Sequence, residues 1–277
     1  MTLLRLIATD LDGTLLTSAH ELSPATIEAV SAATAAGIEV VLASSRGPSA
    51  MRRIIDRLEL TAPVEFISAQ GALIGRFHPD GRFHILQEET IPLELAREVV
   101  AVAGRLDISV NWIRGPAWLV SRFDDATEHQ ISVLQELPTR RDLAAETHPP
   151  HKILLILPDA APAAVISLLD ALPAGLAATL SHPTFVEITA AGVDKGAALR
   201  RLCTSRGISS AEVVAIGDGQ NDLGMFNFAG TSVAMANADP DVLARATMVT
   251  TSNDEDGVAD AISALLGHRL GATGATA

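Results

Sequence analysis

The sequence has a single cysteine, Cys203, so it cannot contain an internal disulfide bond. This cysteine lies in the helix-like run GAALRRLCTSRG, and we expect its thiol to be buried and inert. Long apolar runs are also missing, since no stretch approaches the length of a membrane-spanning helix. The first residues lack the basic region, apolar run and small-residue cleavage site of a signal peptide. These absences predict a soluble, cytoplasmic protein.

Basic residues are outnumbered by acidic ones, with 20 Lys and Arg against 33 Asp and Glu and a formal net charge of −13. Such a surface repels nucleic acids and anionic membranes, so we expect neither as a partner. An anionic ligand would need a metal ion or a few donors placed close to it.

Apolar stretches alternate with helical ones near both ends of the chain, and 48% of its 277 residues are hydrophobic. In the N-terminal part, apolar runs at 3–9 and 37–44 flank a helical stretch that Ser23 caps and Gly37 ends. Nearly continuous apolar strands between helices indicate a parallel sheet covered on both faces. We therefore predict an α/β fold with a Rossmann-like core.

The pattern changes in the middle of the chain, beginning with the strand-like run RFHILQE. The order of strands and helices that follows is β-α-β-β-α-β-α-β, which predicts a separate α+β unit with an open sheet. We assign residues 1–81 and 187–277 to the core and residues 82–186 to the inserted unit.

Acidic residues follow two strands of the predicted core. Asp10 and Asp12 come directly after the first strand, and Asp218 follows the run VVAIG. Ligands bind at the carboxyl edge of open α/β sheets, where these residues would meet. Each "DG" pair alone is typical of a tight turn, but clustered carboxylates repel one another unless a divalent cation neutralises them. Oxygen ligands without His or Cys favour Mg²⁺.

Further polar residues are expected at the same edge. Ser44 follows the strand ending VVLAS and either caps the next helix or joins the acids. Lys195 stands in the first turn of a helix that Asp194 caps, where a cation opposes the helix dipole, so we expect an anionic partner nearby. Asn221 and Asp222 begin another helix and either cap it or contribute to the site.

Four motifs, in this order along the chain, resemble those of the haloacid dehalogenase superfamily, specifically the Cof-type (subclass IIB) phosphatases. They are DLDGT at 10–14, Ser44 in LASSR, Lys195 in GVDKGAAL and GDGQND at 217–222. The resemblance covers nearly the whole chain. It implies a Rossmann-like core with an inserted α+β cap of the C2B type, which would close over the site and determine substrate specificity.

The resemblance also implies a function, a Mg²⁺-dependent phosphatase that forms an aspartyl-phosphate. Asp10 would be the nucleophile, Asp12 the general acid and base, and Lys195 would restrain Asp10. The phosphate group would be bound by Ser44, Ser45, Lys195 and Asn221. The metal ion would be held by Asp10, the backbone carbonyl of Asp12, Asp218 and Asp222. The substrate would be a small phosphorylated metabolite, such as a sugar phosphate or a phosphorylated cofactor.

Two positions depart from the family pattern, and both border the expected pocket. Ser45 stands where relatives usually have the glycine of Thr-Gly-Arg, and Gln70 stands where they usually have asparagine. Arg46, Gln70 and Gly71 are candidate substrate contacts. Five residues of the inserted unit have two possible roles. They either contact the leaving group or belong to the core and loops of the unit itself: Trp112, Arg114, Trp118, His148 and His151.

Alternative functions stay open at this point. Asp12 favours hydrolysis of phosphate esters over carbon–halogen cleavage, because dehalogenases of the superfamily lack this second aspartate. A phosphosugar mutase would use the same aspartyl-phosphate and return the phosphoryl group to the substrate. A non-catalytic protein that binds a phosphorylated ligand would be expected to have lost Asp10, Asp12, Lys195 or Asp218. An assembly component, whose cap is chiefly an interaction surface, would fit the high apolar content. We expect a monomer or a small homo-oligomer.

Overall fold

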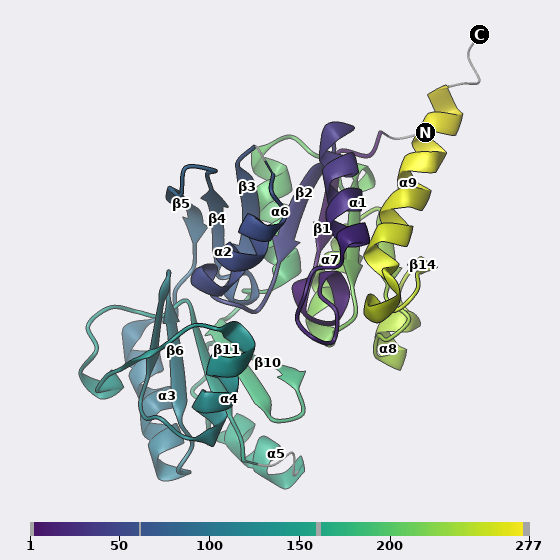
Figure 1. Cartoon of the computed structure of the whole chain (residues 1–277). Coiled ribbons are helices and arrows are strands. Elements are labelled where there is room, and N and C mark those ends of the chain that lie inside the picture. The colour runs from purple at the N-terminus through teal and green to yellow at the C-terminus, as the bar shows by residue number, and fades with distance from the viewer. Residues whose placement is uncertain (1–2, 61, 159–161, 274–277) are drawn as a thin grey trace.

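The computed structural model describes residues 3–60, 62–158 and 162–273, which form two sheets with their own helices (Figure 1). The first sheet has the strand order β14-β13-β12-β1-β2-β3-β4-β5. Its parallel strands are β1 (Leu6–Thr9), β2 (Glu39–Ala43), β3 (Val64–Ser68), β12 (Val213–Gly217), β13 (Thr231–Ala234) and β14 (Met248–Val249). Antiparallel strands complete one edge, namely β4 (Leu73–Phe77) and β5 (Phe83–Glu88).

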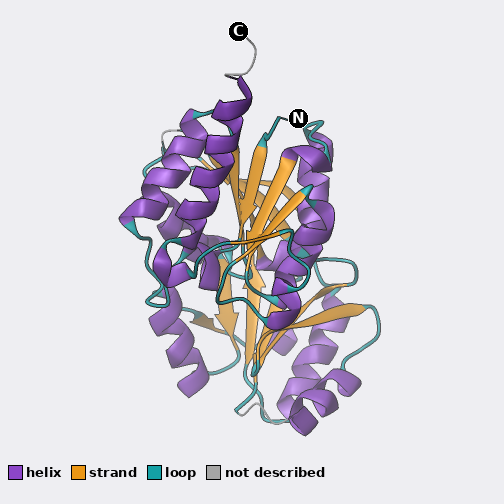
Figure 2. Cartoon of the chain, turned by 90° about the vertical axis from the view of Figure 1, so that its right-hand side faces the viewer, coloured by secondary structure: helices purple, strands orange, loops and turns teal. Residues whose placement is uncertain are grey.

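Helices cover both faces of the first sheet, because successive residues of a strand point to opposite sides (Figure 2). On β1, Ile7 belongs to the apolar cluster under α1, α2 and α9, whereas Leu6 and Ala8 belong to the cluster under α6, α7 and α8. These helices are α1 (Pro24–Ala35), α2 (Pro48–Arg57), α6 (Lys195–Ser205), α7 (Leu223–Phe228), α8 (Pro240–Leu243) and α9 (Gly257–Thr273). The prediction of an α/β fold with a parallel sheet covered on both faces is confirmed.

Local signals explain where two of these helices begin and end. The Ser23 hydroxyl caps α1 by accepting a hydrogen bond from the N–H of Thr26 at 3.1 Å. The Asp194 carboxylate caps α6 by accepting one from the N–H of Ala197 at 2.8 Å. Gly37 follows α1 with a φ of +75°, a left-handed conformation that favours glycine. The predicted capping residues are therefore confirmed.

The second sheet has the order β10-β11-β9-β6-β7-β8 and is antiparallel except for the pair β7 and β8. Its strands are β6 (Val110–Arg114), β7 (Ala117–Val120), β8 (Thr139–Arg140), β9 (Lys152–Ile156), β10 (Leu176–His182) and β11 (Phe185–Ala190). One face packs against α3 (Leu93–Arg105) and α5 (Pro162–Ala171), and the other contacts α4 (Asp125–Leu134). We call the segment from α3 to β11 the second unit.

The two sheets place both boundaries between the units at positions that differ from the sequence prediction. The strand at 83–88, which we assigned to the inserted unit, is β5 and pairs with β4 in the first sheet. β11 extends the second sheet to Ala190, beyond the predicted boundary at 186. Both differences have one physical cause, since the alternation of side chains along a strand identifies the strand but not the neighbour with which it pairs.

Among the described residues, none of the helices is both long and apolar enough to cross a membrane. The cysteine follows its prediction, because Cys203 on α6 is fully buried in the cluster beneath the first sheet. Burial, with a smaller effect of the nearby Glu39, raises the pKa of the Cys203 thiol to about 11.

We expect this thiol to be unreactive in the folded protein. At about pH 8 the folded chain should not react with Ellman's reagent, because reaction requires an accessible thiolate. Unfolding in guanidinium chloride should release one reactive thiol per chain. Rapid labelling of the native protein would contradict the burial described here.

Candidate active site

The site lies at the carboxyl edge of the first sheet, where β1 and β12 end side by side. The two strands are paired in register, with Thr9 opposite Ile216, and the N–H of Asp10 donates to the carbonyl of Ile216 at 3.0 Å. Asp10 and Asp218 therefore leave neighbouring strands at the same edge. Carboxylate oxygens of Asp10, Asp218 and Asp222 lie within 4.8 Å of one another.

Two glycines make room for this cluster. A Cβ atom on Gly13 would lie 2.4 Å from Oδ2 of Asp218, and the φ of Gly13 is +74°. A Cβ atom on Gly217 would lie 2.5 Å from Cγ of Asp222. Any side chain at either position would displace a carboxylate, so the glycines of DLDGT and GDGQND have a steric role.

Lys195 lies at the centre of the cluster and is completely buried. Its Nζ atom is 2.6 Å from Oδ1 of Asp10 and 2.8 Å from Oδ1 of Asp222. Burial alone would lower the pKa of Lys195, but the two carboxylates outweigh burial and hold it above its ordinary value. The anionic partner that we expected for this helix-start lysine is therefore a pair of aspartates.

The other oxygen of Asp222 is occupied by the backbone. Oδ2 of Asp222 accepts hydrogen bonds from the N–H groups of Asp218 and Gly219, each at 3.0 Å. Oδ1 of Asp218 accepts from the hydroxyl of Thr14 at 2.7 Å. Asp222 thus braces the loop that carries Asp218, while Thr14 orients the Asp218 carboxylate.

The cluster carries excess negative charge, because one ammonium group faces three carboxylates. Burial and the neighbouring Asp222 raise the pKa of Asp10 well above its ordinary value. The same two causes, in the same order, raise the pKa of Asp218 to about 6. A divalent cation would neutralise the repulsion between these carboxylates, and carboxylate oxygens are donors that Mg²⁺ prefers. The residues fit such an ion.

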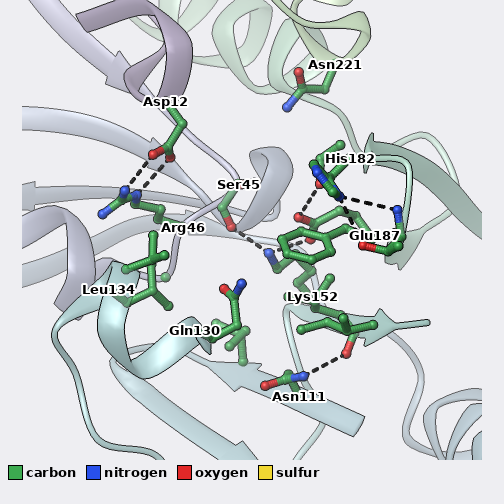
Figure 3. Close-up of a pocket in the computed structure, with 18 of the residues that line it drawn as sticks. Asp12, Ser45, Arg46, Asn111, Gln130, Leu134, Lys152, His182, Glu187 and Asn221 are labelled. Carbon is green, nitrogen blue, oxygen red and sulfur yellow. Dashed lines mark hydrogen bonds and ion pairs between the residues drawn. The ribbon is translucent and has the colours of Figure 1, made fainter. Parts of the chain in front are cut away.

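Asp12 points toward Arg46, as Figure 3 shows. Its oxygens accept two hydrogen bonds from the guanidinium, from Nε at 2.8 Å and from Nη2 at 2.5 Å. Nδ1 of His20 lies 3.2 Å from Oδ1 of Asp12. Burial would raise the pKa of Asp12, but the hydrogen bonds from His20 and Arg46 hold it far below its ordinary value.

The predicted phosphate-binding residues lie next to the acids. Ser44 is buried, and its hydroxyl accepts a hydrogen bond from the N–H of Arg46 at 3.1 Å. Ser45 and Asn221 line the cavity described below. The amide of Asn221 donates to Oε1 of Gln70 at 3.3 Å.

Gln70 and Gly71 lie behind the site. Neither is among the described residues that line the cavity, and their role as candidate substrate contacts stays a prediction. Gln70 reaches the site through Asn221, and its φ is +60°. A Cβ atom on Gly71 would lie 2.2 Å from the carbonyl oxygen of Asp194, so this glycine allows the close approach of α6.

A cavity of about 540 Å³ opens over the acids, between the two units (Figure 3). We call the rest of the chain, with the first sheet and its helices, the first unit. The residues of the first unit that line the cavity include Asp10, Asp12, Ser45, Arg46, Asp218 and Asn221. From the second unit, Lys152 and Glu187 face it as a buried ion pair, with Nζ and Oε2 2.5 Å apart. The sequence analysis missed this pair. The signal was a charged residue on the same face as apolar residues in two strands.

The candidate contacts from the second unit separate into different environments. Trp118 lines the cavity, whereas Trp112 is buried in the cluster on the other face of the sheet, so the core interpretation holds for Trp112. Arg114 pairs with Glu146 at 3.6 Å and lies outside the cavity lining.

Neither of the two histidines singled out in the sequence, His148 and His151, lines the cavity. His151 is buried and accepts from the N–H of Gly115 at 2.9 Å, while its Nε2 lies 2.9 Å from Glu88 on β5. His151 therefore joins the two units. His148 is exposed, as the solvated-loop interpretation predicted.

Comparison with known proteins identifies the family. The family model for haloacid dehalogenase-like hydrolases matches residues 7–262. The chain belongs to this family. The recognition made from the four motifs is confirmed, and so is the enzyme class, since similar relatives are named phosphatases.

Two relatives and one solved structure illustrate the similarity. Phosphatase YwpJ of Bacillus subtilis is 30% identical over 95% of this chain and 100% of its own length. Pyridoxal phosphate phosphatase YbhA of Escherichia coli is 30% identical over 93% of this chain and 97% of its own. The crystal structure of a haloacid dehalogenase-like hydrolase from Bacteroides thetaiotaomicron has a TM-score of 0.82 and 30% identity, covering 95% of this chain and 99% of that one.

We expect Mg²⁺ to bind the carboxylate cluster more weakly in acid. Because the pKa of Asp218 is raised to about 6, protons compete with the cation below that pH. Affinity measured by calorimetry should fall by roughly tenfold per pH unit between about pH 6 and pH 5, and stay level above about pH 7. Asp218→Asn should remove most binding, whereas Asp170→Asn, at an exposed site in the second unit, should not. Equal affinity in both variants would contradict this assignment.

Proposed function

We propose that the chain is a Mg²⁺-dependent phosphatase that hydrolyses small phosphorylated metabolites in the cytoplasm through an aspartyl-phosphate at Asp10. The observation that carries the proposal is the placement of Asp10. Its Oδ1 is held by the buried Lys195, and its other oxygen has no hydrogen-bond partner among the described residues. Asp10 also lines the cavity, so this oxygen is available to attack a bound phosphoryl group.

The reaction then has two displacements. An Asp10 oxygen attacks phosphorus, the bond from phosphorus to the leaving oxygen breaks, and Asp12 donates a proton to that oxygen. Water next attacks the phosphorus while Asp12 takes its proton, which releases phosphate and restores the Asp10 carboxylate. Mg²⁺, when held by the Asp10 and Asp218 carboxylates, would neutralise charge on the phosphoryl group and the acids.

Asp12 needs a proton to act as an acid, and its present partners oppose this. The bidentate contact with Arg46 keeps Asp12 ionised. Proton donation therefore requires that Asp12 turn away from Arg46 toward the leaving oxygen. The ionised form described here is the one needed to activate water in the second step.

The remaining roles follow from position. Ser44, Ser45, Asn221 and the backbone around them would bind phosphate oxygens, with Lys195 supplying positive charge. The second unit would act as the cap that excludes water and recognises the leaving group, since its residues line the part of the cavity farthest from the acids (Figure 3).

Phosphate release from a panel of phosphorylated sugars, nucleotides and cofactors, with Mg²⁺ or with a chelator, tests this function. We expect release that depends on Mg²⁺ and disappears in Asp10→Asn. Asp170→Asn is the matched control, because it also replaces an aspartate but lies outside the cavity. Undiminished release by Asp10→Asn would falsify the nucleophile assignment, and conversion of a sugar phosphate to its isomer without release would indicate a mutase.

Asp12→Asn should give a slow enzyme rather than a dead one. Loss of a general acid and base lowers kcat by roughly 10²–10⁴-fold, whereas loss of the nucleophile removes the pathway. The measurement is kcat at saturating substrate for the two asparagine variants side by side. Equal residual rates in both would contradict the separate roles of Asp10 and Asp12.

A further inference from the structure

The cavity above Asp10 has a charged floor and a mainly apolar roof. The floor is the part lined by Asp10, Asp12, Arg46 and Asp218. The roof is the face of the second sheet that does not pack on α3 and α5, together with α4 and the segments after β9 and β10. Its apolar lining residues include Ile113, Trp118, Val133, Leu134, Leu154, Ile156 and Phe185. A leaving group attached to a phosphate on the floor must lie against this roof.

The charged residues of the roof pair with each other and with neighbouring groups. Lys152 donates to the backbone carbonyl of Ser45 at 2.7 Å and pairs with Glu187. The hydroxyl of Ser181 donates to the other oxygen of Glu187 at 2.9 Å. These contacts leave at most one N–H of the Lys152 ammonium for a ligand.

The neutral polar side chains Asn111 and His182 also have partners within the roof. Asn111 accepts from the indole N–H of Trp118 at 3.0 Å and donates to the carbonyl of Leu154 at 3.3 Å. His182 hydrogen-bonds with Thr184 at 3.0 Å. The indole N–H is therefore turned toward Asn111, and the Trp118 side chain offers the cavity an apolar surface.

Gln130 differs from these buried side chains, each of which has at least one partner. It is buried on α4 and lines the cavity, and Figure 3 shows its amide directed toward the middle of the cavity. Among the described residues, its side chain has no hydrogen-bond partner. His129 also lines the cavity, but it is exposed and remains solvated.

We propose that the leaving group of the substrate is a mainly apolar ring or chain with few polar atoms, one of which hydrogen-bonds to Gln130, and not a polyhydroxylated sugar. This inference rests on the proposed function and adds the substrate class to it. A sugar presents hydroxyls on all sides, and each one buried without a partner weakens binding. An apolar body gains from contact with the roof and leaves the internal polar pairs intact.

Three primary alkyl phosphates test the proposal: benzyl phosphate, pyridoxal 5′-phosphate and glucose 6-phosphate. All three leave through an oxygen on a CH₂ group, so differences in kcat/KM report recognition of the body. With Mg²⁺ present, we expect kcat/KM for benzyl phosphate and for pyridoxal 5′-phosphate to exceed that for glucose 6-phosphate by at least about tenfold. A preference for glucose 6-phosphate, or equal values, would overturn the proposal. No Mg²⁺-dependent release from any of the three would overturn the proposed function, and this inference with it.

Two variants locate the preference in the roof. Leu134→Ser should lower kcat/KM for benzyl phosphate by roughly tenfold relative to glucose 6-phosphate, because it removes apolar contact. Leu137→Ser is the matched control, since Leu137 follows α4 but is 79% exposed and lies outside the cavity. The ratio of two substrates for one variant cancels any general loss of activity. An unchanged ratio in Leu134→Ser would count against the roof as the recognition surface.

Gln130→Leu separates the polar contact from the apolar one. We expect it to lower kcat/KM for pyridoxal 5′-phosphate, whose ring carries polar groups, and to leave benzyl phosphate unchanged or improved. If kcat/KM fell equally for benzyl phosphate and pyridoxal 5′-phosphate, Gln130 would have only a structural role and the polar part of the proposal would be wrong.

Discussion

The ammonium group of Lys195 is completely buried between the carboxylates of Asp10 and Asp222, and the site depends on this contact. A buried charge without partners costs roughly several kcal/mol, so neither the lysine nor the aspartates would be stable there alone. The three residues come from α6, from the end of β1 and from the start of α7. The ion pair therefore ties together the chain segments that lie before and after the second unit, and the same contact orients Asp10, the proposed nucleophile.

The floor and the roof of the cavity differ in chemical character. The floor concentrates charge at the sheet edge, where backbone N–H groups and glycines hold the carboxylates close together. The roof is a sheet face whose polar groups are paired internally, so it offers mainly apolar contact. Lys152 belongs to the roof but donates to the backbone carbonyl of Ser45, so under the proposed function recognition of the leaving group and placement of the phosphate would be linked.

Local sequence signals predicted the first unit well. Strand-end acids, helix caps and the first-turn lysine depend on contacts within a few residues or on parallel strands that end at one edge, and DLDGT and GDGQND have that character. The second unit depends on pairing between distant segments. Nothing local in RFHILQE indicates that β5 joins β4, and FVEITA alone does not reveal that Glu187 meets Lys152 across the sheet. Arg46, with its bidentate hold on Asp12, was likewise a contact across 34 residues.

The central claim is that Asp10 becomes covalently phosphorylated. The direct test is acid quenching of Asp12→Asn during turnover of a ³²P-labelled phosphate monoester, followed by digestion and identification of the labelled peptide. The account predicts label on the peptide that contains Asp10, sensitive to hydroxylamine and absent when Asp10 is also replaced by asparagine. Label on a different residue, or continued phosphate release with no labelled peptide at any quench time, would contradict it.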